Sequence, residues 1–482
     1  MSNSLTTTRV KFAFGVGQMA EGIKNCAVAV FLIFFYTNVM GLSGTLAGSA
    51  LMIALCFDAV SDPLMGYISD SFKSRWGRRH PFMYAGAIPM AISFYCLFVP
   101  PDNLGQTGLF IWMTVFTILT RVSMTIYSVP HMAMNAELTN DYGERTTLSA
   151  LRMFFSMMGF LAVAIGSFNY FLVATPEFPK GQLNPAGYPP FALTFAILMV
   201  VVIWYSALGT HHTIPFLPQA PKNKKPFSPG RFLADMTSPF RVRSFRVVAT
   251  GMVFYYIMYG GINAVSLYLY TYFWDFSSQQ IGILLPISLL TIALAVPFTR
   301  KVVRIIGEKR DTWIICSIWA SFFLSLMIFL RLFGLLPENG HPSLFYLVGI
   351  TIALGQMGYG IVITLGTSIL ADLTDEHERI YHTRQEGLYY GAMSLMQKMS
   401  SGVGSLLAGV MADFSGISKL RGTDIATPEN LTLLGWSMAP VVIVVTLLAV
   451  LFIRQYDIDR ARLKEILVEL AERKSGNVEV AS

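Results

Sequence analysis

Apolar segments of roughly 20 residues or more recur along the whole chain and are separated by shorter polar stretches. A helix needs about that length to cross about 30 Å of hydrocarbon, where it satisfies its backbone hydrogen bonds internally. The pattern therefore predicts twelve membrane-spanning helices. Their expected ranges are 12–38, 45–70, 82–99, 107–134, 148–174, 190–209, 247–274, 280–299, 312–333, 343–371, 387–412 and 431–453.

The longest polar interruption, residues 210–246, is rich in proline and lysine and separates six predicted spans from six. The expected organisation is an N-terminal bundle at 1–209, a cytoplasmic linker at 210–246, a C-terminal bundle at 247–453 and a cytoplasmic tail at 454–482. This all-α polytopic membrane fold with two pseudo-symmetric six-helix bundles is typical of secondary transporters whose halves rock about a central site. A simple tether accounts for the linker alone equally well.

Orientation follows from the basic residues, because cytoplasmic loops of membrane proteins carry an excess of Lys and Arg. With the N-terminus inside, the loops on the opposite side hold only Lys180, Lys419 and Arg421. We expect a multi-pass protein of the plasma (inner) membrane with both termini in the cytoplasm. The net charge of +7 then reflects topology and not nucleic-acid binding, since the basic residues are divided among many short loops.

Composition narrows the function classes further. Of the 482 residues, 54% are hydrophobic and 13% are charged, which leaves no soluble domain of ordinary size. The chain lacks a phosphate-binding glycine loop, a serine elbow and a cluster of metal ligands, so neither an enzyme nor an ATP-driven pump is predicted. No cofactor is expected apart from a coupling ion. The four cysteines show no metal-ligand spacing and are interpreted as small core residues.

Asp58 and Asp62 are the most informative residues, because they lie in the middle of the apolar stretch 46–68. Four residues apart on a helix, they share one face. Each carboxylate at bilayer depth costs ~2.5–3.5 kcal/mol, so the pair needs compensation. Two carboxylates on one face also repel each other, and a bound Na⁺ or H⁺ would remove that repulsion. Permanent neutralisation by Lys398 or Arg152 is the structural alternative.

Pro63 directly follows this pair and leaves a backbone carbonyl oxygen without its helical donor. Such an oxygen is a ligand of the hard kind that Na⁺ prefers. A plain helix kink is an equally good interpretation of this proline.

Five stretches together resemble the glycoside-pentoside-hexuronide:cation symporters, the branch of the major facilitator superfamily that contains melibiose permease. The Asp-x-x-x-Asp-Pro element followed by Arg-Trp-Gly is the most specific feature. The stretches are Phe34 to Val39, Asp58 to Gly66, Arg75 to Pro81, Glu137 to Thr146 and Arg384 to Ala392. A basic loop with a glycine also follows the second span of each half, at 69–79 and 300–310, as in the signature loop of that superfamily.

The resemblance implies a twelve-helix facilitator fold that couples uptake of a sugar or glycoside to Na⁺ or H⁺. Asp58 and Asp62 match the family's cation-binding aspartates, Lys398 matches a lysine beside that site, and Arg152 matches an arginine near the sugar. The chain also departs from melibiose permease, because the stretch 120–125 lacks an aspartate that contacts the sugar there.

Further candidates for substrate binding are Glu21, Tyr268 and Tyr272. Glu21 could accept hydrogen bonds from sugar hydroxyls, or it could simply neutralise Lys24 three residues later. The two tyrosines offer rings for the apolar faces of a sugar and hydroxyls for its polar groups, although Tyr and Trp also form ordinary belts at the membrane interface. Arg121 is expected to pair with an acidic group elsewhere in the bundle.

The predicted function is cation-coupled symport of a sugar or glycoside by alternating access, with a small solute, a monovalent cation and the lipid bilayer as partners. A lysolipid or another amphipathic solute is the alternative cargo, since relatives of this family transport such molecules. A membrane receptor that binds ligand without net transport is the alternative from another class, but no soluble output domain follows Arg454.

Overall fold

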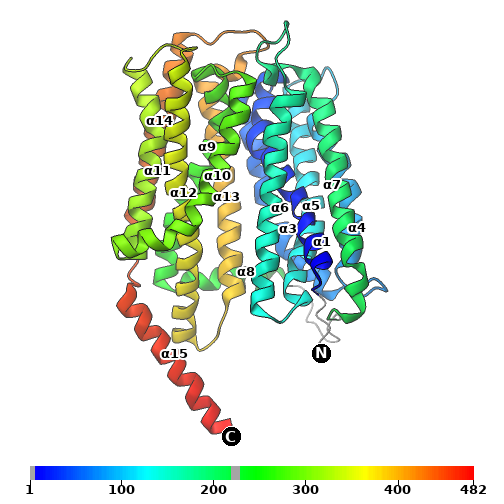
Figure 1. Cartoon of the computed structure of the whole chain (residues 1–482), viewed down its shortest axis with the longest axis vertical. Helices are drawn as coiled ribbons and strands as arrows, with labels where there is room; N and C mark the ends of the chain where they lie inside the picture. The colour runs from blue at the N-terminus through cyan, green and yellow to red at the C-terminus, as the bar shows by residue number, and fades with distance from the viewer. Residues whose placement is uncertain (1–5, 219–227, 482) are drawn as a thin grey trace. The chain divides into compact units, whose positions relative to one another are not determined.

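The protein is described by a computed structural model that covers residues 6–218 and 228–481. Within these residues the chain is helical and contains no strand (Figure 1). Each predicted span is present as a helix or a run of helices. They are α1 to η2 (Thr8–Gly17, Met19–Cys26, Ala27–Leu32, Phe35–Val39), α3 (Gly44–Ser71), α4 (His80–Phe98), α5 (Gln106–Leu138), α6 with η3 (Tyr142–Gly166, Ser167–Phe171), α7 (Tyr188–Thr210), α9 with η8 (Arg243–Tyr268, Leu269–Phe273), α10 (Ser278–Ile306), α11 (Lys309–Leu332), α12 (Pro342–Tyr381), α13 (Glu386–Phe414) and α14 (Pro428–Ile453).

Ten of the helical segments in the described residues are long and apolar enough to cross a membrane. The other two predicted spans are exceptions for different reasons. The first is divided into the short helices α1, α2, η1 and η2, and the α13 span carries polar residues such as Gln397 and Lys398 along its length. Polar or broken helices of this kind are tolerated in membranes where they line a cavity or are buried in protein.

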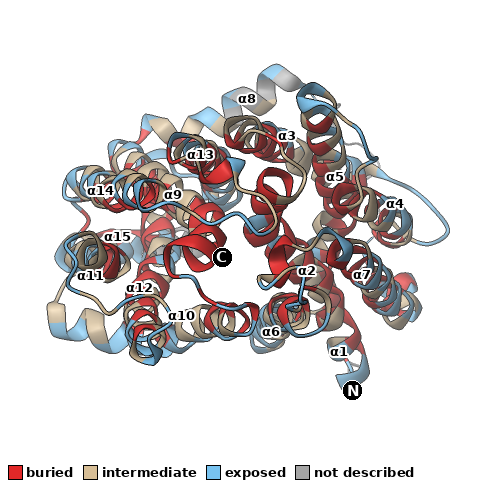
Figure 2. Ribbon diagram, turned by 90° about the horizontal axis from the view of Figure 1, so that it is seen from above, coloured by how far each residue is buried: buried red, intermediate tan, exposed pale blue. Residues whose placement is uncertain are grey.

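The burial pattern is that of helices that pack on one side and face hydrocarbon on the other (Figure 2). On α7, for example, Phe195 and Met199 are buried, whereas Ile197 and Val201 on the opposite face are exposed. Exposed apolar faces this extensive are unfavourable in water and are accounted for by contact with lipid. The described fold is therefore that of a membrane protein.

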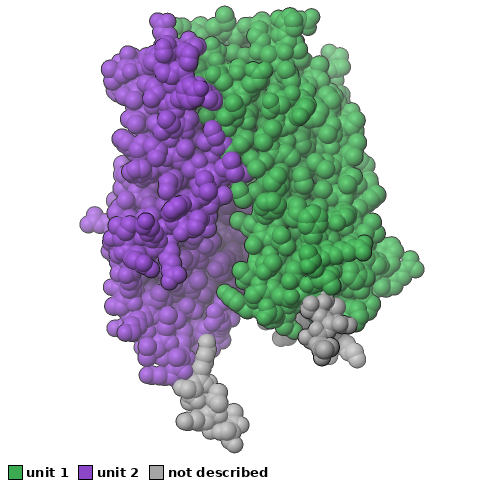
Figure 3. All heavy atoms as spheres, viewed as in Figure 1, with its two compact units in different colours: residues 1–226, 260–286, 402–434 green, residues 227–259, 287–401, 435–482 purple. Residues whose placement is uncertain are grey.

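The chain divides into two compact units, which are described separately (Figure 3). Unit 1 consists of residues 1–226, 260–286 and 402–434, and unit 2 consists of residues 227–259, 287–401 and 435–482. Unit 1 thus includes η8 and the last part of α13, together with the helices α1 to α7.

The predicted linker and tail contain helices of their own. The linker includes η6 (His211–Phe216), α8 (Pro229–Thr237) and η7 (Ser238–Arg241), whereas Lys222, Lys224 and Lys225 lie outside the described residues. The predicted tail contains α15 (Arg460–Ala481), a helix of 22 residues.

Two glycines allow α2 and α6 to approach closely within unit 1. A Cβ atom at Gly22 would lie 1.9 Å from the carbonyl oxygen of Ser156, and one at Gly159 would lie 2.2 Å from that of Met19. Small residues are typical of such contacts in membranes, where packing is the main attraction between helices. This contact sets the position of α2, which carries Gln18 at its start and Glu21 in its first turn.

We predict that Gly159→Ala destabilises the protein, because the added methyl group cannot avoid the backbone of Met19 without moving α2. The detergent-solubilised variant is expected to unfold several degrees below the parent in a thermal melt. Gly387→Ala is the matched control, since nothing lies within 4 Å of a Cβ atom there. Equal melting temperatures for the two variants would contradict the close packing of α2 on α6.

Candidate functional site

Asp58 and Asp62 lie on one face of α3 and meet two residues of α5, in the interior of unit 1. Arg121 donates from Nη2 to Oδ2 of Asp58 at 2.9 Å. The hydroxyl of Thr125 lies 2.7 Å from Oδ1 of Asp62 and 3.2 Å from Oδ1 of Asp58. Asp58, Arg121 and Thr125 are buried, and Asp62 is half-buried. We call these four residues the carboxylate site.

The geometry follows from the register of two neighbouring helices. Asp58 pairs with Arg121 and Asp62 pairs with Thr125, with the same sequence separation of 63 residues. Because a single span, α4, returns the chain between them, α3 and α5 run in the same direction and their i, i+4 positions stay level. Arg121 therefore lies level with Asp58, and Thr125 lies level with Asp62.

The chemistry of Thr125 is important because a hydroxyl carries one proton but can accept as well. Its one proton can be donated to Asp62 or to Asp58, or shared unequally between them. A protonated carboxyl group could in turn donate to the hydroxyl, and a cation between the oxygens could take all of them as ligands. Carboxylate and hydroxyl oxygens are the hard ligands that Na⁺ prefers.

Three of the four residues of the carboxylate site are ionisable. Asp58 and Asp62 carry two negative charges when ionised, and Arg121 carries one positive charge. Pro63, inside α3, adds a further oxygen, because it cannot donate the helical hydrogen bond to the carbonyl of Ala59. The set as a whole is suited to one additional monovalent cation.

A second polar cluster lies between the start of α2 and the middle of α6. Arg152 donates from Nε and Nη2 to the side-chain oxygen of Gln18, at 3.2 and 3.1 Å. The amide nitrogen of Gln18 donates in turn to Glu21. The guanidinium carbon of Arg152 also lies 5.9 Å from the ring centre of Phe14. The structure thus brings the predicted residues Arg152 and Glu21 together through Gln18, a residue that the sequence analysis did not select.

Tyr268 and Tyr272 are buried in unit 1, where their hydroxyl groups contact the end of the first span. The hydroxyls of Tyr268 and Thr37 are 2.6 Å apart, and Asn38 donates to the hydroxyl of Tyr272 at 2.9 Å. Asn38 also donates to the carbonyl oxygen of Ile417. In this structure the tyrosines therefore join the first span to the end of α9 and to η8. Their contact with substrate stays a prediction.

Asp413, at the end of α13, caps the first turn of α3. Its carboxylate accepts from the backbone amides of Gly44 and Thr45 at 2.7 and 2.8 Å, and from the hydroxyl of Ser43 at 2.7 Å. The first amides of a helix have no partner within it and favour negative charge, so this is a stabilising contact. It lies on the side of the protein predicted to be extracellular and joins a helix of the first half to one of the second.

Lys398 is half-buried on α13 and belongs to unit 2, whereas Asp58 and Asp62 belong to unit 1. Its predicted role as their counter-ion therefore stays a prediction. The sequence predicts an acidic partner for Arg121 without identifying it, and it does not single out Thr125 or Asp413. The i, i+4 spacing of Arg121 and Thr125 repeats the spacing of the two aspartates, and this repetition was the available signal. Asp413 gave none, because its partners lie about 370 residues earlier in the chain.

A family model described as MFS/sugar transport protein matches residues 13–460. Among similar proteins, the inner membrane symporter YicJ of Escherichia coli is 20% identical over 98% of this chain and 97% of its own length. The isoprimeverose transporter of Lactiplantibacillus pentosus is 26% identical over 84% and 80%. The sodium-dependent lysophosphatidylcholine symporter 1 of Gallus gallus is 22% identical over 97% and 90%.

The fold is shared with solved structures as well. The xylose transporter XylE from E. coli, in an inward open conformation, has a TM-score of 0.63 at 15% identity, with 95% of this chain and 98% of that chain covered. The expected twelve-helix facilitator fold is thus confirmed. With the family model matched over nearly the whole length, the chain belongs to the sugar transport proteins of the major facilitator superfamily, which are membrane transporters and not enzymes.

Proposed function

We propose that the protein is a symporter that couples one Na⁺ or H⁺ to the entry of a sugar or glycoside. The observation that carries this proposal is the carboxylate site, in which two aspartates share one hydroxyl donor and one arginine. The names of similar proteins support it, because they include a symporter, a sodium-dependent symporter and a transporter of the sugar isoprimeverose. The site needs no cofactor beyond the coupling ion.

In the proposed cycle, the two carboxylates of the carboxylate site attract one monovalent cation. Na⁺ would be held by oxygens of Asp58, Asp62 and Thr125, and H⁺ would be held by one carboxyl that donates to Thr125. Either ion removes the repulsion between the two carboxylates. The neutral site is cheaper to carry through the low-dielectric interior during a conformational change, so movement of the loaded protein is favoured.

Lys398 completes the cycle as the counter-ion that we propose for the cation-free state. Its ammonium group would compensate the excess negative charge on the return step and be displaced when the cation binds. A ligand shifts the equilibrium between two conformational states only as far as its affinities for these states differ. An exchangeable lysine supplies that difference, whereas the buried Arg121 stays with Asp58 throughout.

For the substrate we favour a sugar or glycoside over an amphipathic lipid. Arg152, Gln18 and Glu21 form a connected set of hydrogen-bonding groups, and a sugar presents several hydroxyls that such groups can bind. The sodium-dependent lysophosphatidylcholine symporter among the similar proteins keeps a lysolipid as the second candidate. We further propose the plasma membrane as the location, with both termini in the cytoplasm.

Several hydrogen bonds join the two halves of the chain at the helix ends that are predicted to be extracellular. Asn38 bonds to Tyr272 and to the carbonyl of Ile417, and Asp413 caps α3. All of these bonds join a segment of the first half to one of the second within unit 1. In the proposed cycle, entry of substrate from outside requires these hydrogen bonds to break. The helix α3 has both the capped end and the aspartates of the carboxylate site.

The coupling role of the aspartates predicts that Asp58→Asn and Asp62→Asn abolish gradient-driven accumulation. Either change removes a negative charge that holds the cation. The measurement is uptake of a panel of labelled glycosides by proteoliposomes under an imposed Na⁺ or H⁺ gradient. We expect accumulation above equilibrium for the parent and only equilibration for the two variants.

Asp102→Asn, in an exposed loop, is the matched control and should accumulate substrate as the parent does. Parent-like accumulation by both site variants would refute the proposed cation site. Entry of a labelled lysolipid but of no glycoside would instead refute the proposed cargo. Binding of a glycoside without net entry under any gradient would favour a receptor.

The ion pair between Arg121 and Asp58 predicts strong coupling in a double-mutant cycle. Arg121→Gln or Asp58→Asn alone leaves an uncompensated buried charge, which costs about 3–5 kcal/mol, whereas the double variant removes both charges. Thermal melts should therefore show a double variant more stable than the sum of the single losses predicts. The exposed pair Arg384 and Glu386 is the control and should show little coupling. Additive losses at Arg121 and Asp58 would show that the pair is not a unit.

The cap on α3 predicts that Asp413→Asn opens the outer side. The change weakens several hydrogen bonds to a charged acceptor, and a loss of ~1.4 kcal/mol shifts the population about tenfold. The readout is the labelling rate of Ser405→Cys, a buried position of α13 beside α3, with a membrane-impermeant thiol reagent added outside. Asp424→Asn in the loop after α13 should label at the parent rate. An unchanged rate for Asp413→Asn would contradict a gating role for the cap.

A further inference from the structure

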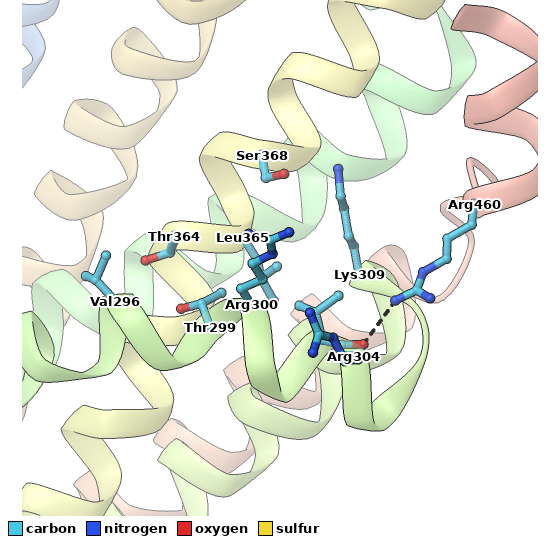
Figure 4. Close-up of a pocket in the computed structure, with 10 residues that line it drawn as sticks. Val296, Thr299, Arg300, Arg304, Lys309, Thr364, Leu365, Ser368 and Arg460 are labelled. Carbon is cyan, nitrogen blue, oxygen red and sulfur yellow. Dashed lines mark hydrogen bonds between the residues drawn. The ribbon is translucent and has the colours of Figure 1, made fainter. Parts of the chain in front are cut away.

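A cavity of about 500 Å³ lies in unit 2. It is formed by the end of α10, the start of α11, the middle of α12 and the first residue of α15 (Figure 4). Four basic side chains line it. They are Arg300, Arg304, Lys309 and Arg460.

These basic residues are only partly compensated. Lys309 pairs with Asp372 at 2.6 Å, and Glu308 accepts from the backbone amide of Arg460 at 3.3 Å. Among the described residues, Arg300 and Arg304 have neither an ion-pair partner nor a hydrogen-bond partner for their side chains. Four positive charges thus face two negative ones, and the cavity retains an excess of positive charge.

The corresponding place in the first half shows that this excess is not required by the fold. There the loop after α3 carries Arg78 and Arg79, and Glu137 on α5 accepts from both at 2.8 Å. Asp70 pairs with Arg79 as well, at 2.6 Å. Arg78 and Arg79 are thus neutralised within the first half, whereas Arg300 and Arg304 at the end of α10 are left available to a ligand.

The polar groups of the cavity suit a phosphate. Arginine side chains bind phosphate oxygens with two parallel hydrogen bonds, and they are more weakly hydrated than lysine. The hydroxyl of Ser368, on α12, lines the same cavity and adds a neutral donor. A carboxylate ligand would use the same donors, but the apolar surroundings described next favour a lipid phosphate.

Apolar residues continue from the cavity along the helix surfaces. Val296 lines the cavity and is 48% exposed, and Ile305 at the end of α10 is 73% exposed. The face of α11 that begins beside the cavity exposes Ile315 and Trp319. A basic cavity at the end of membrane helices can bind the headgroup of a lipid, and the exposed apolar surface beside it can contact the acyl chains.

We propose that this cavity binds the phosphate of an anionic phospholipid from the leaflet that faces Arg300 and Arg304, which is the cytoplasmic leaflet in the predicted topology. The phosphate lies between Arg300, Arg304 and Arg460, and the acyl chains run along Val296 and the exposed face of α11. Because Arg460 begins α15, the bound lipid ties the C-terminal tail to α10 and α11.

The test is native mass spectrometry of the purified full-length protein in detergent, titrated with phosphatidylglycerol or with phosphatidylcholine of the same chain length. We expect the parent to bind phosphatidylglycerol at least tenfold more tightly. In Arg300→Gln/Arg304→Gln this preference should fall to within about twofold. Lys301→Gln/Lys464→Gln removes the same charge from exposed residues that do not line the cavity and should keep the preference.

Equal losses in the cavity variant and in the control variant would overturn the proposal, because binding would then follow surface charge alone. So would saturation of the cavity by inorganic phosphate at concentrations that displace phosphatidylglycerol completely, because the ligand would then be a free anion. The single variants Arg300→Gln and Arg304→Gln keep the test decisive if the double variant does not fold. Each should lose part of the preference, and a full preference in both would refute the site.

Discussion

The structure depends on the compensation of negative charge in the middle of α3. A carboxylate at bilayer depth is tolerated only with a partner, and Arg121 supplies one for Asp58 at 2.9 Å. Asp62 accepts from the hydroxyl of Thr125, a neutral donor on the same face of α5. In the proposed cycle, this pair of carboxylates is the group that responds to a monovalent cation.

The helix α3 also makes close contacts at its outer end. The first turn of α3 is capped by Asp413 of α13, and its glycines pack against α13 so closely that a Cβ atom at Gly409 would lie 2.0 Å from the carbonyl oxygen of Gly44. α3 thus carries both Asp58 and Asp62 near its middle and the end that Asp413 caps. In the proposed cycle, a change in charge at Asp58 and Asp62 needs no long pathway to reach the gate, because both lie on one helix.

The sequence predicted features that recur along it, such as the apolar segments. It did not predict contacts between residues that are far apart in the chain. Long apolar segments predicted all twelve helical spans, because the bilayer fixes their length, and the five family-like stretches predicted the fold class that the family model confirms. The boundaries were less accurate where a helix continues into polar solvent, as in α12, which ends at Tyr381 instead of 371. Asp58 and Asp62 could be selected because charge is conspicuous in an apolar segment. For Thr125 the only signal was its four-residue spacing from Arg121, because a threonine is ordinary in a membrane helix. Asp413 gave no signal, since the cap on α3 joins residues that are far apart in the chain.

The two halves of the chain differ in how far their basic residues after the second span are neutralised. Each has basic residues in the loop after its second span, where the positive charge helps to set orientation. In the first half Glu137 and Asp70 neutralise Arg78 and Arg79, so the loop is fixed by protein contacts alone. In the second half Asp372 neutralises only Lys309, and Arg300 and Arg304 face a cavity. In the two proposals made above, the membrane contributes a ligand to the basic cavity of unit 2, and the carboxylates of unit 1 bind the transported cation.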